Sequence, residues 1–264
     1  MITYNYHTHT KRCGHAVGED EDYVIAAIEN NHKIIGFSDH VFIPNMTQEG
    51  IRGNYDELEN YLYSLNHLKD KYKDKIEVLI GFECEYFEEL EDYYRDLLMS
   101  GKVDYLILGQ HYISYEDNKM EGYIASSKIS TEKYVSLIEK GLKTGLFSIL
   151  VHPDLFLTEK GLDEDGVKLA HRICKSAFEN DVYLEVNQGG MRRGQRLIDK
   201  EYRYQYPVRE FFEIAKRHKN KFVMGIDAHS PFDYFHPVNR IYAYNLVKNW
   251  NIDIEKNVKL KKVK

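Results

Sequence analysis

The sequence has few cysteines, no long apolar run and no excess of positive charge. Its three cysteines, Cys13, Cys84 and Cys174, are odd in number and far apart, which argues against a disulfide framework. No stretch approaches the roughly 18 apolar residues of a membrane-spanning helix, and the first residues do not resemble a secretory signal. The net charge of −6 argues against broad contact with nucleic acid. We therefore expect a cytoplasmic protein that binds neither membrane nor nucleic acid.

Signatures of several enzyme classes are also missing. The chain has no G-x-S-x-G elbow, no P-loop and no G-x-G-x-x-G fingerprint. No repeat, low-complexity tract or Pro/Gly-rich linker divides its 264 residues. With 43% hydrophobic and 30% charged residues, the chain can bury a full core, and we expect a single domain over residues 1–264.

Seven short apolar runs, rich in β-branched and aromatic residues, predict strands. They lie at residues 2–6, 33–38, 76–82, 103–109, 146–151, 182–186 and 222–226. Segments with helical period separate several of them, at 58–68, 134–142, 167–178 and 208–215. Such alternation is typical of parallel strands joined by right-handed crossovers, either in a barrel or in a doubly wound sheet.

A polar residue stands at or just after the end of each predicted strand. Neighbours in this series are 28 to 43 residues apart, the size of one strand–helix unit, and the series is His7, His40, Glu83, His111, His152, Asn187 and Asp227. In a barrel the carboxyl ends of all strands meet at one rim, whereas in an open sheet these residues would form a row. The recurrence favours an α/β barrel with its site at the carboxyl ends of the strands.

Histidines gather at the same positions. His7 and His9 are two apart on one strand, so both imidazoles enter one space. Nitrogen and oxygen donors together suit Zn²⁺, Mn²⁺ or Fe²⁺. Nine donors are too many for one tetrahedral ion, so we predict two or three metal ions. The candidate ligands are His7, His9, His15, His40, Glu83, His111, His152, Asp227 and His229.

A cluster of this kind is suited to hydrolysis of a small phosphate monoester. Metal ions can hold a bridging hydroxide as nucleophile and neutralise phosphate oxygens, so no serine or cysteine nucleophile is needed. The proton donor to the leaving oxygen stays open between a bound water, Asp227 and His152. A non-catalytic protein that stores or senses metal is the alternative from another class, and failure to release phosphate from any ester would favour it.

Two long segments after predicted strands offer substrate contacts. Residues 112–130 are polar and rich in tyrosine, as in a substrate lid, and residues 188–206 carry four arginines. Arg192 and Arg193, nearest the strand end, are the predicted phosphate clamp. Further candidates for contact with an imidazole or an ammonium group are Tyr112, Tyr115, Tyr202, Tyr206, Glu116 and Asp117. The basic tail at 256–264 is predicted to be solvated.

Six ordered motifs resemble those of the PHP (polymerase and histidinol phosphatase) superfamily. They are H-T-H at 7–9, S-D-H at 38–40, G-F-E at 81–83, Q-H at 110–111, V-H-P at 151–153 and D-A-H at 227–229. The resemblance implies a distorted, TIM-like (β/α)₇ barrel with a trinuclear metal centre. The ligand sets that it implies are His7, His9, Glu83 and Asp227 for one ion, bridging Glu83 with His111 and His152 for a second, and His15, His40 and His229 for the third.

Within the superfamily, the chain most resembles the monofunctional, HisK-like histidinol-phosphate phosphatases. This resemblance depends on the runs H-P-D-L-F and E-V-N-Q-G-G-M-R and on the lack of an attached polymerase. It implies hydrolysis of L-histidinol phosphate to L-histidinol and phosphate, in histidine biosynthesis. Asn187-Gln188 departs from the Asn-Thr or Asn-Ser frequent in that family. Nucleotides, phosphotyrosine and nucleic-acid ends are the alternative substrates, and the sequence gives neither metal identity nor oligomeric state.

Overall fold

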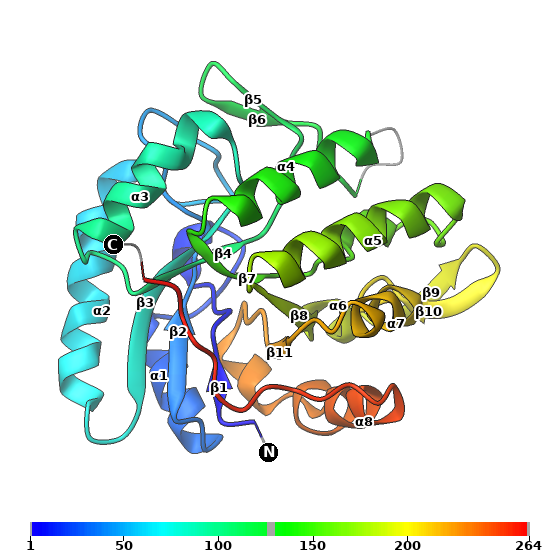
Figure 1. Ribbon diagram of the computed structural model, residues 1–264. Coiled ribbons are helices and arrows are strands. Elements are labelled where there is room, and N and C mark those ends of the chain that lie inside the picture. The colour runs from blue at the N-terminus through cyan, green and yellow to red at the C-terminus, as the bar shows by residue number, and fades with distance from the viewer. Residues whose placement is uncertain (1, 126–129, 263–264) are drawn as a thin grey trace.

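A seven-stranded parallel sheet curled into a barrel forms the centre of the computed structural model, which describes residues 2–125 and 130–262 (Figure 1). In sheet order the strands are β1 Tyr4–Asn5, β2 Ile34–Phe37, β3 Glu77–Cys84, β4 Tyr105–Leu108, β7 Phe147–Leu150, β8 Tyr183–Asn187 and β11 Phe222–Gly225. A parallel bridge between Thr8 and Ala228 joins the segments that follow β1 and β11. All seven predicted strands are present, and the predicted α/β class and distorted (β/α)₇ barrel are confirmed.

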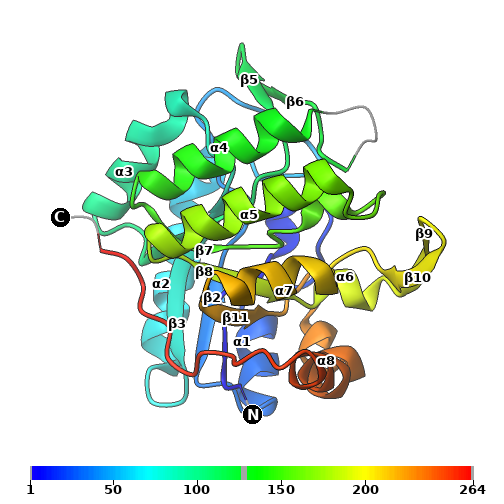
Figure 2. The same ribbon diagram turned by 45° about the vertical axis from the view of Figure 1, so that its right-hand side comes forward.

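Helices cover the outside of the barrel (Figure 1). They are α1 Asp20–Glu29, α2 Leu58–Tyr72, α3 Glu91–Met99, α4 Thr131–Lys143, α5 Glu164–Glu179, α7 Arg209–Arg217 and α8 Ala243–Asn249. On one flank α4 packs against α5 and α5 against α7, as Figure 2 shows. Gly145 has φ of 76° just after α4, as expected for a helix that ends in the left-handed conformation. The helix predicted over 167–178 is present as α5, but Phe178 in its last turn is exposed.

The inside of the barrel is filled by aromatic and aliphatic side chains. Tyr4, Tyr6, Tyr105 and Tyr183 belong to one buried cluster with Ile107 and its aliphatic neighbours. The Tyr105 hydroxyl donates to two backbone carbonyls, at 2.8 and 3.0 Å. Since the interior is a packed core, the open space needed for chemistry lies at the rim.

The C-terminal segment crosses the amino ends of the strands (Figure 1). The backbone amide of Lys259 donates to the Tyr183 hydroxyl at 3.0 Å, and that of Lys261 donates to Ser148 Oγ at 2.9 Å. Val258 and Leu260 pack against the interior cluster. The prediction of a solvated tail is therefore wrong for residues 258–261, where Val258 and Leu260 anchor the segment, while the side chains of Lys256, Lys259 and Lys262 are exposed as predicted.

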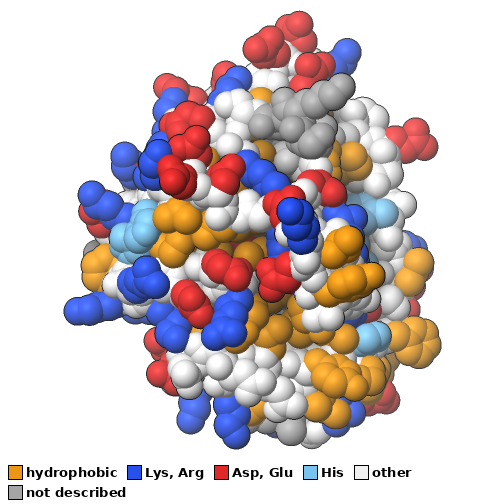
Figure 3. All heavy atoms as spheres, turned by 90° about the vertical axis from the view of Figure 1, so that its right-hand side faces the viewer, with side chains coloured by type: hydrophobic (Ala, Val, Ile, Leu, Met, Phe, Trp, Pro, Cys, Tyr) orange, Lys and Arg blue, Asp and Glu red, His pale blue; other side chains and the backbone are white. Residues whose placement is uncertain are grey.

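Two hairpins and a short helix interrupt the loops at the carboxyl rim. Strands β5 Ser114–Glu116 and β6 Lys119–Glu121 follow β4, while α6 Gly189–Arg192, β9 Gln195–Ile198 and β10 Glu201–Tyr204 follow β8. Residues 126–129 of the predicted lid lie outside the described residues. On the face seen in Figure 3, basic side chains alternate with acidic and hydrophobic ones, so that face is not uniformly positive. None of the helices described is long and apolar enough to cross a membrane.

Candidate metal centre

All nine predicted ligands converge at the carboxyl ends of the strands, around Glu83. One oxygen of Glu83 lies 2.8 Å from His152 Nε2 and 3.5 Å from His111 Nε2. Its other oxygen contacts three more imidazoles, with distances of 3.2 Å to His9 Nε2, 3.4 Å to His7 Nε2 and 3.4 Å to His40 Nδ1. One carboxylate at the end of β3 thus joins histidines that follow β1, β2, β4 and β7.

Asp227 gathers the remaining donors from the other side of the rim. Its Oδ1 atom lies 3.5 Å from the Nε2 atoms of both His7 and His9 and 3.4 Å from His229 Nδ1. His229 Nε2 in turn lies 3.0 Å from His15 Nε2. Asp227 has φ of 53°, a left-handed backbone uncommon for residues other than glycine. This strain accompanies the sharp turn that aims the aspartate into the site.

The buried Glu83 carboxylate fits in the site because the nearby residue 109 is a glycine. Glu83, His7 and His9 are each about 1% exposed. A Cβ atom built on Gly109, beside β4, would overlap the Glu83 carboxylate. Any larger residue at position 109 would therefore displace Glu83 from the imidazoles.

Charges within the site oppose one another. Burial alone would raise the pKa of Glu83, but the surrounding imidazoles, that of His7 first, hold this pKa well below its ordinary value. The same balance lowers the pKa of Asp227. Burial drives the pKa of His40 well below its ordinary value, and burial with the neighbouring His9 lowers that of His229 to about 3. His40 and His229 are therefore neutral beside ionised carboxylates. Glu185 and its neighbouring carboxylates instead outweigh burial and raise the pKa of His7, so His7 must release its proton when a cation binds.

The donor set fits divalent metal ions. His7 Nε2 and His9 Nε2 face each other at 3.1 Å with two carboxylates nearby, so several lone pairs point into one space. Buried Nδ1 atoms of His9, His40 and His152 have no hydrogen-bond partner among the described residues. Groups of three donors whose ligand atoms lie within 4.8 Å of one another include His7–Glu83–His152, His7–His9–Asp227, His9–His40–Glu83 and His40–Glu85–His111.

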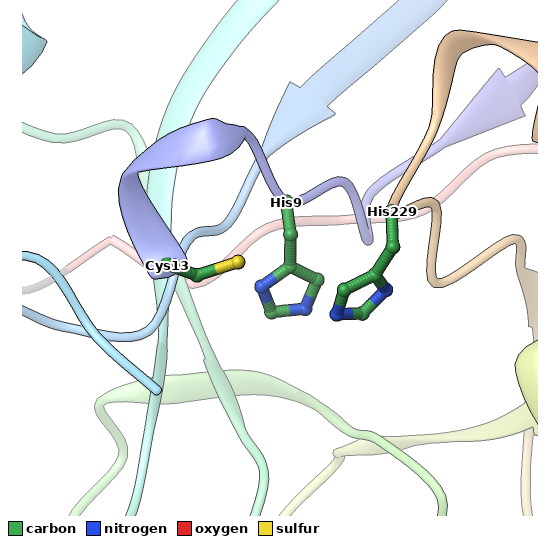
Figure 4. Close-up of side chains that lie close together, drawn as sticks. All are labelled: His9, Cys13 and His229. Atoms are coloured by element: carbon green, nitrogen blue, oxygen red, sulfur yellow. The ribbon is translucent and has the colours of Figure 1, made fainter. Parts of the chain in front are cut away.

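Cys13 approaches the same cluster. Its sulfur points toward the ring of His9, which stacks on His229 with ring centroids 4.3 Å apart (Figure 4). These three residues form another group whose ligand atoms lie within 4.8 Å of one another. The thiol is fully buried, and burial raises its pKa to about 12. All three cysteines are buried and none is in a disulfide, as expected.

A cavity of about 410 Å³ opens beside the histidines. Arg193 and three tyrosines line it together with the candidate ligands. The Arg193 guanidinium lies 5.7 Å from the centre of the Tyr206 ring, and the Tyr123 ring is nearly parallel to that of His111 at 6.5 Å. Tyr112 also lines the cavity. A cation and aromatic faces beside the metal-binding groups suit a small anionic substrate with a flat or apolar part.

Other predicted substrate contacts lie elsewhere. Arg192 donates to the carbonyl oxygens of Ile226 and Asp227 at 2.6 and 2.7 Å, so its guanidinium braces the end of β11. Glu116 is exposed in the β5–β6 hairpin and does not line the cavity. The remaining candidates are Tyr115, which stacks on Phe87, exposed Tyr202, and Asp117 at the tip of the hairpin.

Four residues at the site were not among the predicted ones. Glu85 and Glu185 are buried carboxylates that contact His111 and His7, and Arg52 pairs with Glu85. Tyr123 lines the cavity. A signal for Glu185 was present, since a charged residue inside the apolar run V-Y-L-E-V needs a buried partner.

Comparisons with known proteins agree with this geometry. The PHP domain family matches residues 5–189. A Deinococcus radiodurans protein named "Probable histidinol-phosphatase" is 26% identical over 237 residues, 85% of each chain. A structure of histidinol phosphate phosphatase from Lactococcus lactis, complexed with Zn, L-histidinol and phosphate, has a TM-score of 0.71 at 15% identity, over 99% of this chain and 97% of that one. The hisK protein of Listeria monocytogenes has a TM-score of 0.68 at 20% identity, over 90% of this chain and 99% of that one. The chain belongs to the PHP domain family.

Proposed function

We propose that the protein is a metal-dependent phosphomonoesterase that hydrolyses L-histidinol phosphate to L-histidinol and phosphate, in cytoplasmic histidine biosynthesis. The convergence of nine nitrogen and oxygen donors beside a cavity that holds one arginine carries this proposal. The similarity to histidinol phosphatases along most of the chain supports the substrate.

The nine donors divide into three sets, which would hold two or three ions, Zn²⁺, Mn²⁺ or Fe²⁺. Glu83 is the bridging ligand in this scheme because its two oxygens face different imidazoles. When bound, the ions would activate a water for attack and neutralise phosphate oxygens. The sets are His7, His9, Glu83 and Asp227; Glu83, His111 and His152; and His15, His40 and His229.

Arg193 would orient the phosphate. Its guanidinium lies over the Tyr206 ring at the wall of the cavity, and a guanidinium binds two phosphate oxygens at once. Tyr123 and Tyr112 would contact the imidazole of the substrate. We leave Arg192 out of this role because its donors are bonded to backbone carbonyls. The proton for the leaving alkoxide would come from a bound water, from His152 or from Asp227, and the last two line the cavity. Asp227 is ionised at rest, so it would first take a proton from the attacking water.

Steady-state phosphate release tests the proposal. Metal-loaded protein is given histidinol phosphate, a nucleoside monophosphate, a phosphotyrosine peptide and a nucleic acid with a terminal phosphate. We expect the highest kcat/KM for histidinol phosphate, and loss of activity after chelation and in His9→Ala. His67→Ala, a change on the exposed side of α2, is the matched control. Activity that survives both chelation and His9→Ala would refute the mechanism, while a preference for another ester would change the substrate alone.

A further inference from the structure

Two buried carboxylates contact histidines of the cluster at Nδ1, the ring nitrogen that faces away from Glu83. Glu85 Oε1 lies 3.0 Å from His111 Nδ1, and Glu185 Oε1 lies 2.9 Å from His7 Nδ1. Glu85 directly follows β3 and Glu185 lies in β8, a hundred residues further along the sequence. In both cases the opposite ring nitrogen, Nε2, faces Glu83. The order carboxylate, imidazole, Glu83 therefore occurs twice in the site, once through His111 and once through His7.

The hydrogen bonds fix which nitrogen of each ring carries the proton. A carboxylate can only accept, so His111 and His7 must donate through Nδ1–H. In the neutral ring, the form that binds a metal ion, Nε2 then carries the lone pair. A carboxylate behind a metal-binding imidazole also makes that imidazole a stronger ligand. From this geometry we propose that Glu85 and Glu185 are positioning residues that set the affinity of two different metal ions, Glu85 through His111 and Glu185 through His7. The inference depends on the proposed function, because it requires that the cluster binds metal.

Glu85 belongs to a charge-compensated network. The Arg52 guanidinium donates to both of its oxygens, at 3.0 and 3.1 Å, and both side chains are almost fully buried. Arg52 also donates to the carbonyl oxygen of Val41 at 3.0 Å and to Gln48 Oε1 at 2.8 Å. This pair therefore ties the loop between β2 and α2 to His111. Because the pair is neutral overall, its main contribution to the ion is orientation of the ring.

Within residues 2–125 and 130–262, Glu185 has no arginine or lysine among its hydrogen-bond partners. Its second oxygen accepts from the backbone amide of His152 at 3.0 Å and from Asn187 Nδ2 at 2.8 Å. A Cβ atom on Gly225, in the adjacent strand β11, would overlap the carboxylate. The site thus reserves space for a negative charge behind His7, which adds attraction for a cation to the orientation of the ring.

Metal binding by Glu85→Gln and Glu185→Gln tests the inference. Metal-free protein is titrated with Zn²⁺ against a chromophoric chelator, and the ions retained after gel filtration are counted. We expect each variant to bind one ion roughly 10- to 100-fold more weakly while it keeps the others. Co²⁺-loaded variants should show a changed visible spectrum for the affected ion. Glu91→Gln is the control, since Glu91 bonds Tyr86 and Arg95 instead of a histidine.

Two further variants separate position from charge. Glu85→Gln leaves Arg52 buried without its partner, so it is also made together with Arg52→Met, which removes the stranded charge. We expect the double variant to fold and to bind the affected ion as weakly as Glu85→Gln does. Recovery of wild-type affinity would show that Glu85 only neutralises Arg52, which would overturn its positioning role. Gly225→Ala should displace Glu185 and lower the affinity for the same ion that Glu185→Gln affects.

The outcomes distinguish this inference from the proposed function. If wild-type protein retains no ion and releases no phosphate, the proposed function fails. If wild-type protein binds its ions and hydrolyses histidinol phosphate while both Glu→Gln variants bind every ion within twofold of wild type, only the positioning roles are refuted.

Discussion

The two ends of the barrel use the same seven strands for opposite purposes. At the amino end, tyrosines such as Tyr4, Tyr105 and Tyr183 pack with aliphatic side chains, and the C-terminal segment closes over them. At the carboxyl end, Glu83, Asp227 and seven imidazoles crowd around a cavity. The amino end buries apolar surface and the hydrogen-bonded hydroxyl group of Tyr105, while the carboxyl end buries charge and leaves the Nδ1 atoms of His9, His40 and His152 without a hydrogen-bond partner in the part of the chain that the structure describes.

The difference shows how one fold separates stability from chemistry. Burial of apolar surface at the amino end stabilises the fold, whereas burial of ionised groups at the rim costs free energy unless a partner such as a metal ion compensates them. Substitutions at the rim should therefore change activity and metal binding, and substitutions at the amino end should change the free energy of unfolding. The following five predictions test this division, from the largest effect to the smallest.

Glu83→Gln should break the site while the barrel stays folded. The amide keeps the shape of the side chain but loses the charge shared by five imidazoles, so we expect kcat/KM for histidinol phosphate to fall by about 10³-fold or more, roughly 4 kcal/mol in transition-state stabilisation. Steady-state kinetics and circular dichroism measure the two effects, with Glu91→Gln as control. Near wild-type activity in a folded Glu83→Gln protein would remove Glu83 from the centre of the mechanism.

Deletion of residues 254–264 should destabilise the amino end of the barrel. The truncated chain loses the contacts of Val258 and Leu260 and the hydrogen bonds to Tyr183 and Ser148, so we expect the free energy of unfolding to drop by about 3 kcal/mol. Urea titration measures the loss. At 25 °C kcat/KM should stay within twofold of wild type. A large loss of activity with unchanged stability would contradict the division between the two ends.

Metal removal should lower the free energy of unfolding because the ions bound at the carboxyl rim are lost. For each ion that binds the folded state at a free concentration 100 times its Kd, chelation costs about 2.7 kcal/mol of unfolding free energy. Thermal unfolding with and without chelator measures this as a drop in Tm, and Glu83→Gln should show a much smaller drop. An equal response in both proteins would place the stabilising ions elsewhere.

Tyr105→Phe should cost stability without touching the chemistry. The change removes one hydroxyl that donates to the backbone carbonyls of Tyr6 and Phe37, so we expect about 1 to 2 kcal/mol lower unfolding free energy. Urea unfolding and kcat/KM are measured together. A tenfold loss in kcat/KM would show that the amino end also controls the site.

His32→Phe should make the protein less sensitive to acid. His32 lies just before β2, near the amino end, and burial lowers its pKa to about 4. Between pH 6.5 and 4 the unfolded chain therefore binds a proton that the folded chain does not, so stability falls as pH falls. From pH 7.5 to 5.5 the wild type should lose about 1.4 kcal/mol more than His32→Phe, measured by urea unfolding of metal-free protein. Equal losses would contradict this.

Sequence alone could locate the strands and the nine candidate ligands because both follow simple rules. Apolar runs mark the strands, and a polar residue at the end of each one marks the rim, so His7 and Asp227 could be brought together across the whole chain. The parallel order then follows from the alternation of strands and helices. The same rules cannot say which oxygen of Glu83 faces which histidine.

The residues that sequence missed depend on local packing. Arg192 and Arg193 are neighbours, yet the short helix α6 directs one toward the end of β11 and the other into the cavity. Arg52 meets Glu85 only because the irregular loop after β2 folds back over the rim. The tail has only two apolar residues at alternate positions, Val258 and Leu260, among exposed lysines, so its packing across the barrel depends on the surface that it meets.

Anomalous diffraction from crystals of Zn²⁺-loaded protein tests the central claim most directly. We expect two or three zinc peaks among the nine side chains at the carboxyl rim, with at least one beside Glu83. Crystals that show full zinc occupancy elsewhere on the surface, and no peak near Glu83, would contradict it.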